Sequence, residues 1–260
     1  MPEKPIPTDS RLRDQFSIRA QSFNQSARWM LDDKLLKAHL DLVGKALLHQ
    51  NRLLDLCCGT GIVGTALMRQ GWEPTGVDIT PEMVAVASKI FPAVVGKVEA
   101  LPFPDKSFDA CVIRQSFMLL EGEKSLREIK RVLKPGGLFV FSQSIAISTQ
   151  DEPQYRKIQE ARHINMLRYY SREDLKNTFR KHSFIEEKNI ELRVRENSTQ
   201  WVNRAPELSE QLRAQILNLI TEAPEAYRRI RNVKIENGEV FEDWNWLVLR
   251  LRNENPSLEK

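Results

Sequence analysis

The sequence of 260 residues is poor in the side chains that build metal centres and disulfide frameworks. It has three cysteines, and two of them, Cys57 and Cys58, are adjacent, so they match neither a C-x-x-C zinc pattern nor an even set of paired cysteines. The four histidines stand far apart, without the spacing of metal ligands: His39, His49, His163 and His182. We therefore expect no metal site, and we expect the cysteines to be reduced, buried residues of a cytoplasmic protein.

Long apolar runs and a large charge excess are also missing. No run of about 18 apolar residues occurs, and the first residues lack the apolar core of a secretory signal, so we expect neither a membrane span nor export. Lys and Arg number 39 against 35 Asp and Glu, and the small excess is spread over the chain. Nothing in the charge pattern therefore indicates a nucleic-acid partner, and the oligomeric state stays open. The remaining composition, 41% apolar and 28% charged, is typical of a globular protein.

A glycine-rich stretch stands between an apolar run and a helical pattern. Residues 52–57 are expected to form a buried strand, and the helical pattern begins at Ile62. Gly59 and Gly61 lack a Cβ, so the backbone between strand and helix can adopt positive φ angles and a ligand can lie against it. The free N–H groups at the start of the helix favour a polar or anionic ligand group. With Gly64 these glycines satisfy G-x-G-x-x-G, which alone is a weak signal for a dinucleotide site.

Asp78 ends the next apolar segment, which begins at Thr75. A carboxylate at the end of the second strand can accept hydrogen bonds from the ribose hydroxyls of an adenosine-containing ligand. Thr80 followed by Pro81 then predicts a capped helix start. The glycine loop and Asp78 also occur in NAD-type oxidoreductases, so these two motifs leave two classes of protein open.

Four blocks of sequence, in one family's order and spacing, carry a resemblance. They are Leu53-Leu-Asp-Leu-Cys-Cys-Gly-Thr-Gly61, Gly76-Val-Asp78, Glu99-Ala-Leu-Pro-Phe-Pro-Asp-Lys-Ser-Phe-Asp109 and Leu133-Lys-Pro-Gly-Gly137. The sequence resembles class I S-adenosylmethionine-dependent methyltransferases, in particular the small-molecule group that includes the ubiquinone/menaquinone-type methyltransferases. The resemblance covers about residues 50–145 and weakens after them.

The resemblance and the alternation of strands with helices predict an α/β fold. Such alternation gives a parallel sheet with right-handed crossovers. We expect a Rossmann-like class I methyltransferase fold, with a mostly parallel seven-stranded sheet, an antiparallel C-terminal hairpin and helices on both faces. The expected strands are 52–57, 75–78, 93–98, 108–113, 138–141, 184–194 and 244–251. Residues 1–260 should form one domain of four parts: a helical N-terminal cap (1–50), a cofactor-binding core (51–145), a helical lid or insertion that includes strand six (146–232) and the hairpin (233–252).

The resemblance implies that the cofactor is S-adenosylmethionine, with S-adenosylhomocysteine as its product. It implies cofactor contacts from the loop residues Gly59, Thr60 and Gly61. Asp55 would reach toward the cofactor's amino group, often through water, or would only brace the N–H groups of the loop. Asp78 would bind the ribose.

Around the adenine the implied contacts are less uniform. Ile79 and Met83 would flank the ring, unless they only pack in the core. Many relatives carry an acid where this sequence has Lys97, and lysine cannot accept a hydrogen bond from the adenine amino group. The N–H of Val98 and the carboxylate of Glu99 remain as adenine contacts, and Lys97 is expected to be solvated at the rim.

The fourth strand ends at Arg114. Arg114 would meet the methionine end of the cofactor or point to solvent. Arg114-Gln-Ser-Phe117 stands in place of the Asn-Pro-Pro-Tyr type motif, which counts against methylation of DNA adenine.

The acceptor site is less well marked. In the family the N-terminal segment covers the cofactor, and three of its residues could close over it: Arg19, Phe23 and Trp29. In the lid, Arg168, Tyr170 and Trp201 could hold a flat or acidic acceptor, because aromatic rings supply apolar area and arginine pairs with carboxylates. For each aromatic residue, packing in the core is the competing interpretation.

The predicted activity is transfer of a methyl group from S-adenosylmethionine to a small-molecule acceptor by in-line displacement. Holding two reactants in reach can supply roughly 7–11 kcal/mol, so such an enzyme needs no obvious catalytic residue, and the sequence assigns none. Three alternatives stay open: an NAD-type oxidoreductase, which the block from Leu101 to Asp109 fits poorly, an RNA or protein methyltransferase, and a cofactor-binding module without activity. Basic residues clustered at the mouth of the cleft would favour an RNA or protein acceptor.

Overall fold

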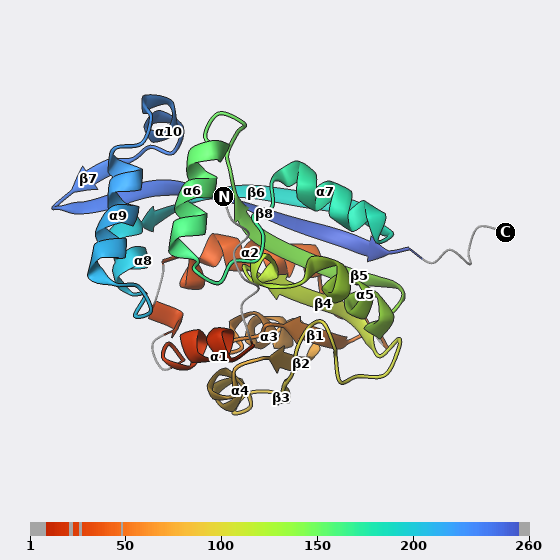
Figure 1. Ribbon diagram of the computed structural model, residues 1–260. Helices are drawn as coiled ribbons and strands as arrows, with labels where there is room; N and C mark the ends of the chain where they lie inside the picture. The colour runs from red at the N-terminus through yellow and green to blue at the C-terminus, as the bar shows by residue number, and fades with distance from the viewer. Residues whose placement is uncertain (1–8, 21–22, 26–27, 48, 255–260) are drawn as a thin grey trace.

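The computed structural model describes residues 9–20, 23–25, 28–47 and 49–254 (Figure 1). We expect the first ten residues, with three prolines among polar residues, and the tail from Asn253 to be loose, and most of these positions lie outside the described residues. The strands are β1 (Arg52–Leu56), β2 (Glu73–Asp78), β3 (Ala93–Val95), β4 (Phe108–Arg114), β5 (Leu133–Ile145), β6 (Phe184–Asn197), β7 (Lys234–Glu236) and β8 (Glu239–Asn253). They form one sheet of order β3-β2-β1-β4-β5-β8-β6, and β7 pairs with β8.

Helices precede and connect these strands. They are α1 (Asp9–Ser17), α2 (Asp33–Val43), α3 (Ile62–Met68), α4 (Pro81–Ala87), α5 (Gly122–Val132), α6 (Glu152–Arg162), α7 (Arg172–Lys181), α8 (Ser198–Asn203), α9 (Glu210–Thr221) and α10 (Glu225–Ile230). Short 3₁₀ helices are η1 (Phe23–Gln25), η2 (Arg28–Leu31) and η3 (Phe117–Leu119).

The predicted mixed sheet is confirmed. β1 pairs in parallel with β2 and β4, and β3 and β5 extend the parallel part on either side. β8 then pairs antiparallel with both β5 and β6. The predicted seven strands correspond to β1–β6 and β8. The short β7 is an additional eighth strand. The sequence Glu236-Asn-Gly-Glu239 is typical of a hairpin turn, and here it joins β7 to β8, with Asn237 (φ 52°) and Gly238 (φ 79°) both in the left-handed region.

Both faces of the central strands are buried, as their continuous apolar runs predict. In β1, Leu53 belongs to the cluster that packs against α2 and α3, and Leu54 belongs to the cluster on the opposite face with α5 and α7. β4 and β5 alternate in the same way. Figure 1 shows the sheet running through the middle of the molecule with helices on either side.

β6 and β8 are longer than the alternation of their residues predicts. Their pairing continues to Asn197 and Phe241, through polar residues outside the predicted strands 184–194 and 244–251. Glu242 illustrates why these residues can be buried, because it accepts hydrogen bonds from the hydroxyls of Ser198 (2.9 Å) and Tyr227 (2.7 Å). The helices α6, α8, α9 and α10 lie together at this end of the sheet (Figure 1).

The N-terminal helices and this insertion pack onto one hydrophobic cluster. The cluster includes Met30 and Leu35 from the N-terminal segment, Trp201 from α8 and Trp246 from β8. The rings of Trp29 and Trp246 lie 4.9 Å apart. The segment before β1 and the insertion after β5 are therefore held together by one shared cluster.

Candidate functional site

The glycine loop after β1 has the backbone geometry that its sequence predicts. Gly59 (φ 53°) and Gly61 (φ 84°) are both in the left-handed region, and Gly61 is the N-terminal cap of α3. Cys57 (φ 50°) is also left-handed, a conformation that costs energy in a residue with a side chain. Gln115 at the end of β4 has φ 53°. Cys57 and Gln115 thus have strained backbones beside the carboxyl ends of β1 and β4, where the pockets described below lie.

Asp55 braces this loop. Its Oδ2 accepts a hydrogen bond from the N–H of Gly64 at 2.9 Å, and the side chain is buried. Burial raises the pKa of the Asp55 carboxyl to about 7, against the opposing effects of the Gly64 hydrogen bond and the positive charge of Arg114. Asp55 is therefore a carboxyl that gains or loses its proton near neutral pH.

Asp78 joins the end of β2 to the same loop. Its Oδ2 accepts from the Gly59 N–H and its Oδ1 from the Thr80 N–H, each at 2.9 Å. Burial raises the pKa of Asp78, and these hydrogen bonds partly offset the shift. Thr80 occupies the predicted cap position of α4, but its side chain makes no capping hydrogen bond, and its own N–H donates to Asp78.

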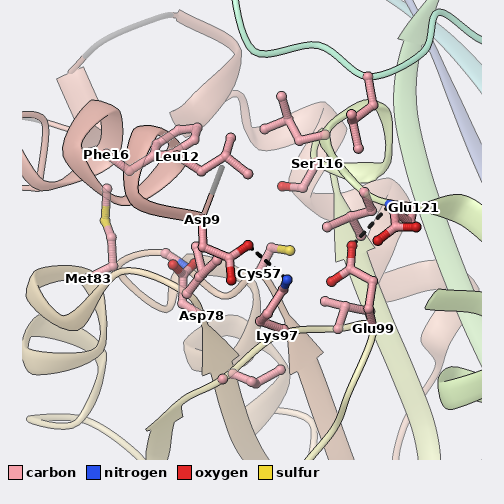
Figure 2. Close-up of a pocket in the computed structure, with 18 of the residues that line it drawn as sticks. Asp9, Leu12, Phe16, Cys57, Asp78, Met83, Lys97, Glu99, Ser116 and Glu121 are labelled. Atoms are coloured by element: carbon pink, nitrogen blue, oxygen red, sulfur yellow. Dashed lines mark hydrogen bonds and ion pairs between the residues drawn. The ribbon is translucent and has the colours of Figure 1, made fainter. Parts of the chain in front are cut away.

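A first pocket, with about 930 Å³ of empty space, lies over the ends of β2 and the loops that follow β3 and β4 (Figure 2). The residues that line it include six that the sequence assigns to the cofactor: Gly59, Asp78, Ile79, Met83, Val98 and Glu99. Met83 and Asp78 lie on one side of the pocket and Glu99 on the other. Glu99 already accepts a hydrogen bond from the Glu121 N–H at 3.0 Å.

The N-terminal helix α1 closes the open side of this pocket. Leu12 and Phe16 point toward it from α1, and Asp9 at the start of the helix lies beside Lys97 (Figure 2). The Nζ of Lys97 is 2.8 Å from Oδ1 of Asp9. Lys97 is 38% exposed at the edge of this pocket, as expected of a solvated rim residue, and its ion pair with Asp9 also connects it to α1. Neither Asp9 nor Leu12 belongs to a motif, so nothing in the sequence marks them.

A second pocket, with about 820 Å³ of empty space, adjoins the first. The two share Phe16, Phe23, Cys57, Gly59, Ser116 and Leu119. The predicted residues Asp55, Thr60, Arg114 and Trp201 line the second pocket, together with Arg19 and Trp29 from the N-terminal segment. Gly61 lines neither pocket and acts through the turn, since a Cβ on it would meet the ring of Phe91 at 2.9 Å.

Arg114 points into the protein and not to solvent. Its guanidinium lies 5.4 Å from the centre of the Trp29 ring, and Nη1 donates to the Met30 carbonyl at 3.4 Å. Burial lowers the pKa of Arg114 to about 10, and the charge of Asp55 opposes this shift. Arg114 and Asp55 thus form a cation and a titratable acid at the floor of the second pocket.

Two of the predicted acceptor residues lie outside both pockets. Tyr170 is buried on the face of the sheet that packs against α5 and α7, and its ring lies 5.1 Å from that of Phe117. Arg168 pairs with Asp174 at 3.2 Å and lies over the Tyr170 ring. Of the three lid residues that could hold an acceptor, Trp201 lines a pocket, whereas Tyr170 packs in the core, which is the competing interpretation, and Arg168 lies outside both pockets. The capping box of Ser171 and Asp174 turns the chain into α7 at this point.

Sequence reasoning missed the end of α6 and the loop after β4. Arg162 and His163 from α6 line the second pocket, as do Gln115 and Met118 after β4. Arg162 and His163 follow a polar helical pattern without a motif, so only the tertiary structure brings them to the site. Among the residues that the structure describes, no group of three or more His, Cys, Asp or Glu side chains is placed to hold a metal ion. No helix in those same residues is both long and apolar enough to cross a membrane.

Comparison with known proteins agrees with this geometry. Residues 54–141 match the family described as "Methyltransferase domain". An uncharacterized methyltransferase of Mycobacterium tuberculosis is 37% identical over 89 residues, which cover 33% of this chain and 37% of that protein. A demethylmenaquinone methyltransferase of Thermotoga maritima is 31% identical over 146 residues, which cover 54% of this chain and 63% of that protein. The aligned part thus spans less than two thirds of the length of these relatives.

Solved structures share the fold over most of the chain. A putative methyltransferase from Bacillus halodurans superimposes with a TM-score of 0.76 at 18% identity, over 85% of this chain and 99% of that one. Geranyl diphosphate C-methyltransferase from Streptomyces coelicolor, solved with S-adenosyl-L-homocysteine, gives a TM-score of 0.60 at 16% identity, over 86% and 79%. Residues 54–141 therefore match a methyltransferase-domain family, and most of the chain shares the fold of these solved methyltransferase structures.

Proposed function

We propose that this protein transfers a methyl group from S-adenosylmethionine to a small-molecule acceptor. The observation that carries the proposal is the adjacency of two pockets at the carboxyl ends of the parallel strands. One pocket is built around Asp78 and the glycine loop, and the other opens from the same loop toward Arg114 and Trp201. One pocket suits the cofactor and the other a second reactant beside it.

The chemistry of the side chains fits the cofactor. Asp78, at the end of β2, offers a carboxylate to the ribose hydroxyls while its hydrogen bond from Gly59 holds the loop. Ile79 and Met83 supply an apolar surface for the adenine ring, and the Val98 N–H and Glu99 supply polar contacts at its edge. At the other end, Asp55 and Arg114 suit the ammonium and the carboxylate of the methionine group.

When bound, the cofactor supplies an activated methyl group, so the protein's part is to position the acceptor and exclude water. Phe23 lines both pockets and lies against Gly59, where a Cβ would approach its ring to 3.4 Å. Together with Trp29 and Trp201 it forms an apolar wall over the junction of the pockets. Holding the two reactants in reach at this junction can supply roughly 7–11 kcal/mol of the barrier.

The second pocket favours a small acceptor over RNA or protein. Arg19 and Arg162, two of its basic residues, are 7% and 2% exposed, so they do not form a basic patch at the mouth of the cleft. An NAD-type oxidoreductase is disfavoured because Asp55 and Arg114 complement an amino acid group, not a nicotinamide. The three free cysteines also agree with our expectation that the protein acts in the cytoplasm.

Calorimetry on the full chain tests the cofactor assignment. We expect S-adenosylmethionine and S-adenosylhomocysteine to bind and NADH to give no heat. Heat with NADH and none with S-adenosylmethionine would overturn the assignment.

A second experiment tests the activity by following transfer of labelled methyl from S-adenosylmethionine into a metabolite extract. Binding without any transfer would favour the module without activity.

A further inference from the structure

We infer that the second pocket selects an acceptor that carries a negative charge on a flat apolar body, with Arg162 and Arg19 as the residues that recognise the charge. The inference rests on the proposed function, because it concerns the reactant beside the cofactor.

Arg19 and Arg162 share one carboxylate. Glu207, after α8, accepts hydrogen bonds from Arg19, with Nε to Oε2 at 3.1 Å and a second contact from Nη2 to Oε1. Arg162 donates from Nη1 to Oε1 of the same carboxylate at 3.2 Å. Arg162 also donates from Nε and Nη2 to the Trp201 carbonyl, at 3.3 and 3.1 Å. Two guanidinium groups thus face one acid.

This cluster is buried and carries an excess positive charge. The side chains of Arg19, Arg162 and Glu207 are 8%, 2% and 8% exposed. Burial, together with the charge of Arg19, lowers the pKa of Arg162 to about 9, although Glu207 opposes the shift. A buried charge without a full counter-charge is costly, so the cluster favours a ligand that brings a negative one.

The excess charge faces the second pocket. Arg19 and Arg162 line that pocket, whereas Glu207 lies behind them and lines a separate shallow pocket with Gln15. Gln15 donates to Glu207 at 3.1 Å and therefore adds no negative charge. Both arginine side chains thus border the second pocket, whereas the acid that partly neutralises them does not.

The cofactor does not use up this charge. In the proposed arrangement its carboxylate meets Arg114 and its ammonium meets Asp55. Its sulfonium adds one more positive charge beside the same pocket. The guanidinium groups of Arg19 and Arg162 are therefore left for the acceptor.

The walls of the pocket suit an apolar body attached to that charge. The Trp201 ring lies between Arg162, which is 5.0 Å from its centre, and Trp244, whose ring is 4.7 Å away. Trp29 and Met118 line the pocket with it. Aromatic and methionine side chains favour a flat apolar group between the anion and the point of methyl transfer. A carboxylate and a phosphate share the required chemistry.

Three probes of one shape test the inference on the full chain saturated with S-adenosylhomocysteine. They are 2-naphthoate, 2-naphthyl phosphate and the neutral 2-naphthamide, each titrated by calorimetry. We expect at least one anion to bind tenfold or more tightly than the amide, and the stronger of the two anions identifies the class. Equal binding of anions and amide, or no binding of any probe at millimolar concentration, overturns the inference.

Substitution then locates the charge. Arg162→Gln should weaken the anion at least tenfold while the amide and S-adenosylhomocysteine change less than about threefold. The matched control is Arg168→Gln, since Arg168 is exposed and outside both pockets, and it should change none of the three affinities. An Arg162→Gln protein that loses S-adenosylhomocysteine instead shows that this arginine serves the cofactor and overturns the inference. If Arg162→Gln does not fold, the comparison of the three probes on the unaltered protein still decides.

These experiments distinguish failure of this inference from failure of the proposed function. Failure of the unaltered protein to bind S-adenosylhomocysteine refutes the function itself. Normal binding of S-adenosylhomocysteine without a preference for anions refutes only the acceptor class.

Discussion

The carboxylate of Asp78 accepts a hydrogen bond from the amide of Gly59 at 2.9 Å across 19 residues of sequence. One oxygen therefore holds the glycine loop, and the other holds the start of α4 through Thr80. The same carboxylate lines the first pocket. The loop geometry and the proposed ribose recognition thus depend on one side chain.

Asp78→Ala should weaken binding of S-adenosylhomocysteine by about 1.5–3 kcal/mol, the range for hydrogen bonds to a charged group. The fold should survive because Asp78 ends a strand and does not belong to the apolar core. Calorimetry measures the affinity, and circular dichroism checks the fold. Asp41→Ala is the control, since Asp41 is exposed on α2 and pairs with Lys37. Unchanged affinity in a natively folded Asp78→Ala protein would show that Asp78 is not the ribose ligand.

Asp55 should make cofactor binding depend on pH. Its pKa in the free protein is raised to about 7, so below that value most of the carboxyl is protonated. An ammonium group beside it favours the ionised form, so binding releases a proton. The affinity for S-adenosylhomocysteine should therefore rise as pH increases from about 5.5 to 7.5, by up to tenfold per pH unit at the acidic end.

Calorimetry in two buffers of different ionisation heat measures the released proton directly. Asp55→Asn keeps the acceptor for the Gly64 N–H but cannot ionise, so the pH dependence over this range should disappear. An equally steep dependence in Asp55→Asn would assign the titration to another group.

His39 should make the fold sensitive to acid. Its Nδ1 lies 2.8 Å from the Leu35 carbonyl and its Nε2 lies 2.6 Å from the Ser142 hydroxyl, so the neutral ring donates to the carbonyl and accepts from the hydroxyl. Burial lowers the pKa of His39 from 6.5 to about 3, with Arg114 acting in the same direction. Between these values the unfolded chain holds a proton that the folded chain lacks. The contribution is therefore fully present above about pH 6.5 and is lost as pH falls toward 3, by about 1.4 kcal/mol per pH unit.

Urea unfolding at several pH values checks this contribution in the unaltered protein and in His39→Gln. The free energy of unfolding should fall less steeply with acid in the variant, by about one proton over this range. Asp55 acts in the opposite direction, but it is common to both proteins and cancels in the comparison. Parallel pH profiles would rule out His39 as the cause.

The ion pair of Asp151 and Arg231 should stabilise the insertion. Arg231 Nε lies 2.7 Å from Asp151 Oδ2, and both side chains are fully buried. Arg231 also donates to the Ile145 carbonyl, so it ties the end of α10 to the end of β5. Arg231→Met leaves a buried acid without its partner and should lower the free energy of unfolding by about 3–5 kcal/mol.

Urea unfolding measures this loss. Arg252→Met is the matched control, because the pair of Arg252 with Glu187 is partly exposed and should contribute less than about 1 kcal/mol. A loss for Arg231→Met no larger than that of the control would contradict the assigned role of the buried pair.

The sequence by itself determined the parallel core and its cofactor loop. A buried strand, a glycine turn and a helix start are local features, so residues 52–78 predict both the backbone of Gly59 and the position of Asp78 at a strand end. The turn at Asn237 and Gly238 and the capping box at Ser171 were predictable for the same reason, because each depends on residues only a few positions apart.

Only the tertiary structure decided what surrounds that loop. Asp9 meets Lys97 across 88 residues, and Arg19 meets Glu207 across 188, through side chains that no motif marks. The tertiary structure also places Arg168 and Tyr170 outside both pockets and Arg162 at the second one. The walls of the second pocket come from packing between distant helices. Such packing depends on how whole apolar faces fit together, and the local pattern of residues does not encode which polar side chains that fit will enclose.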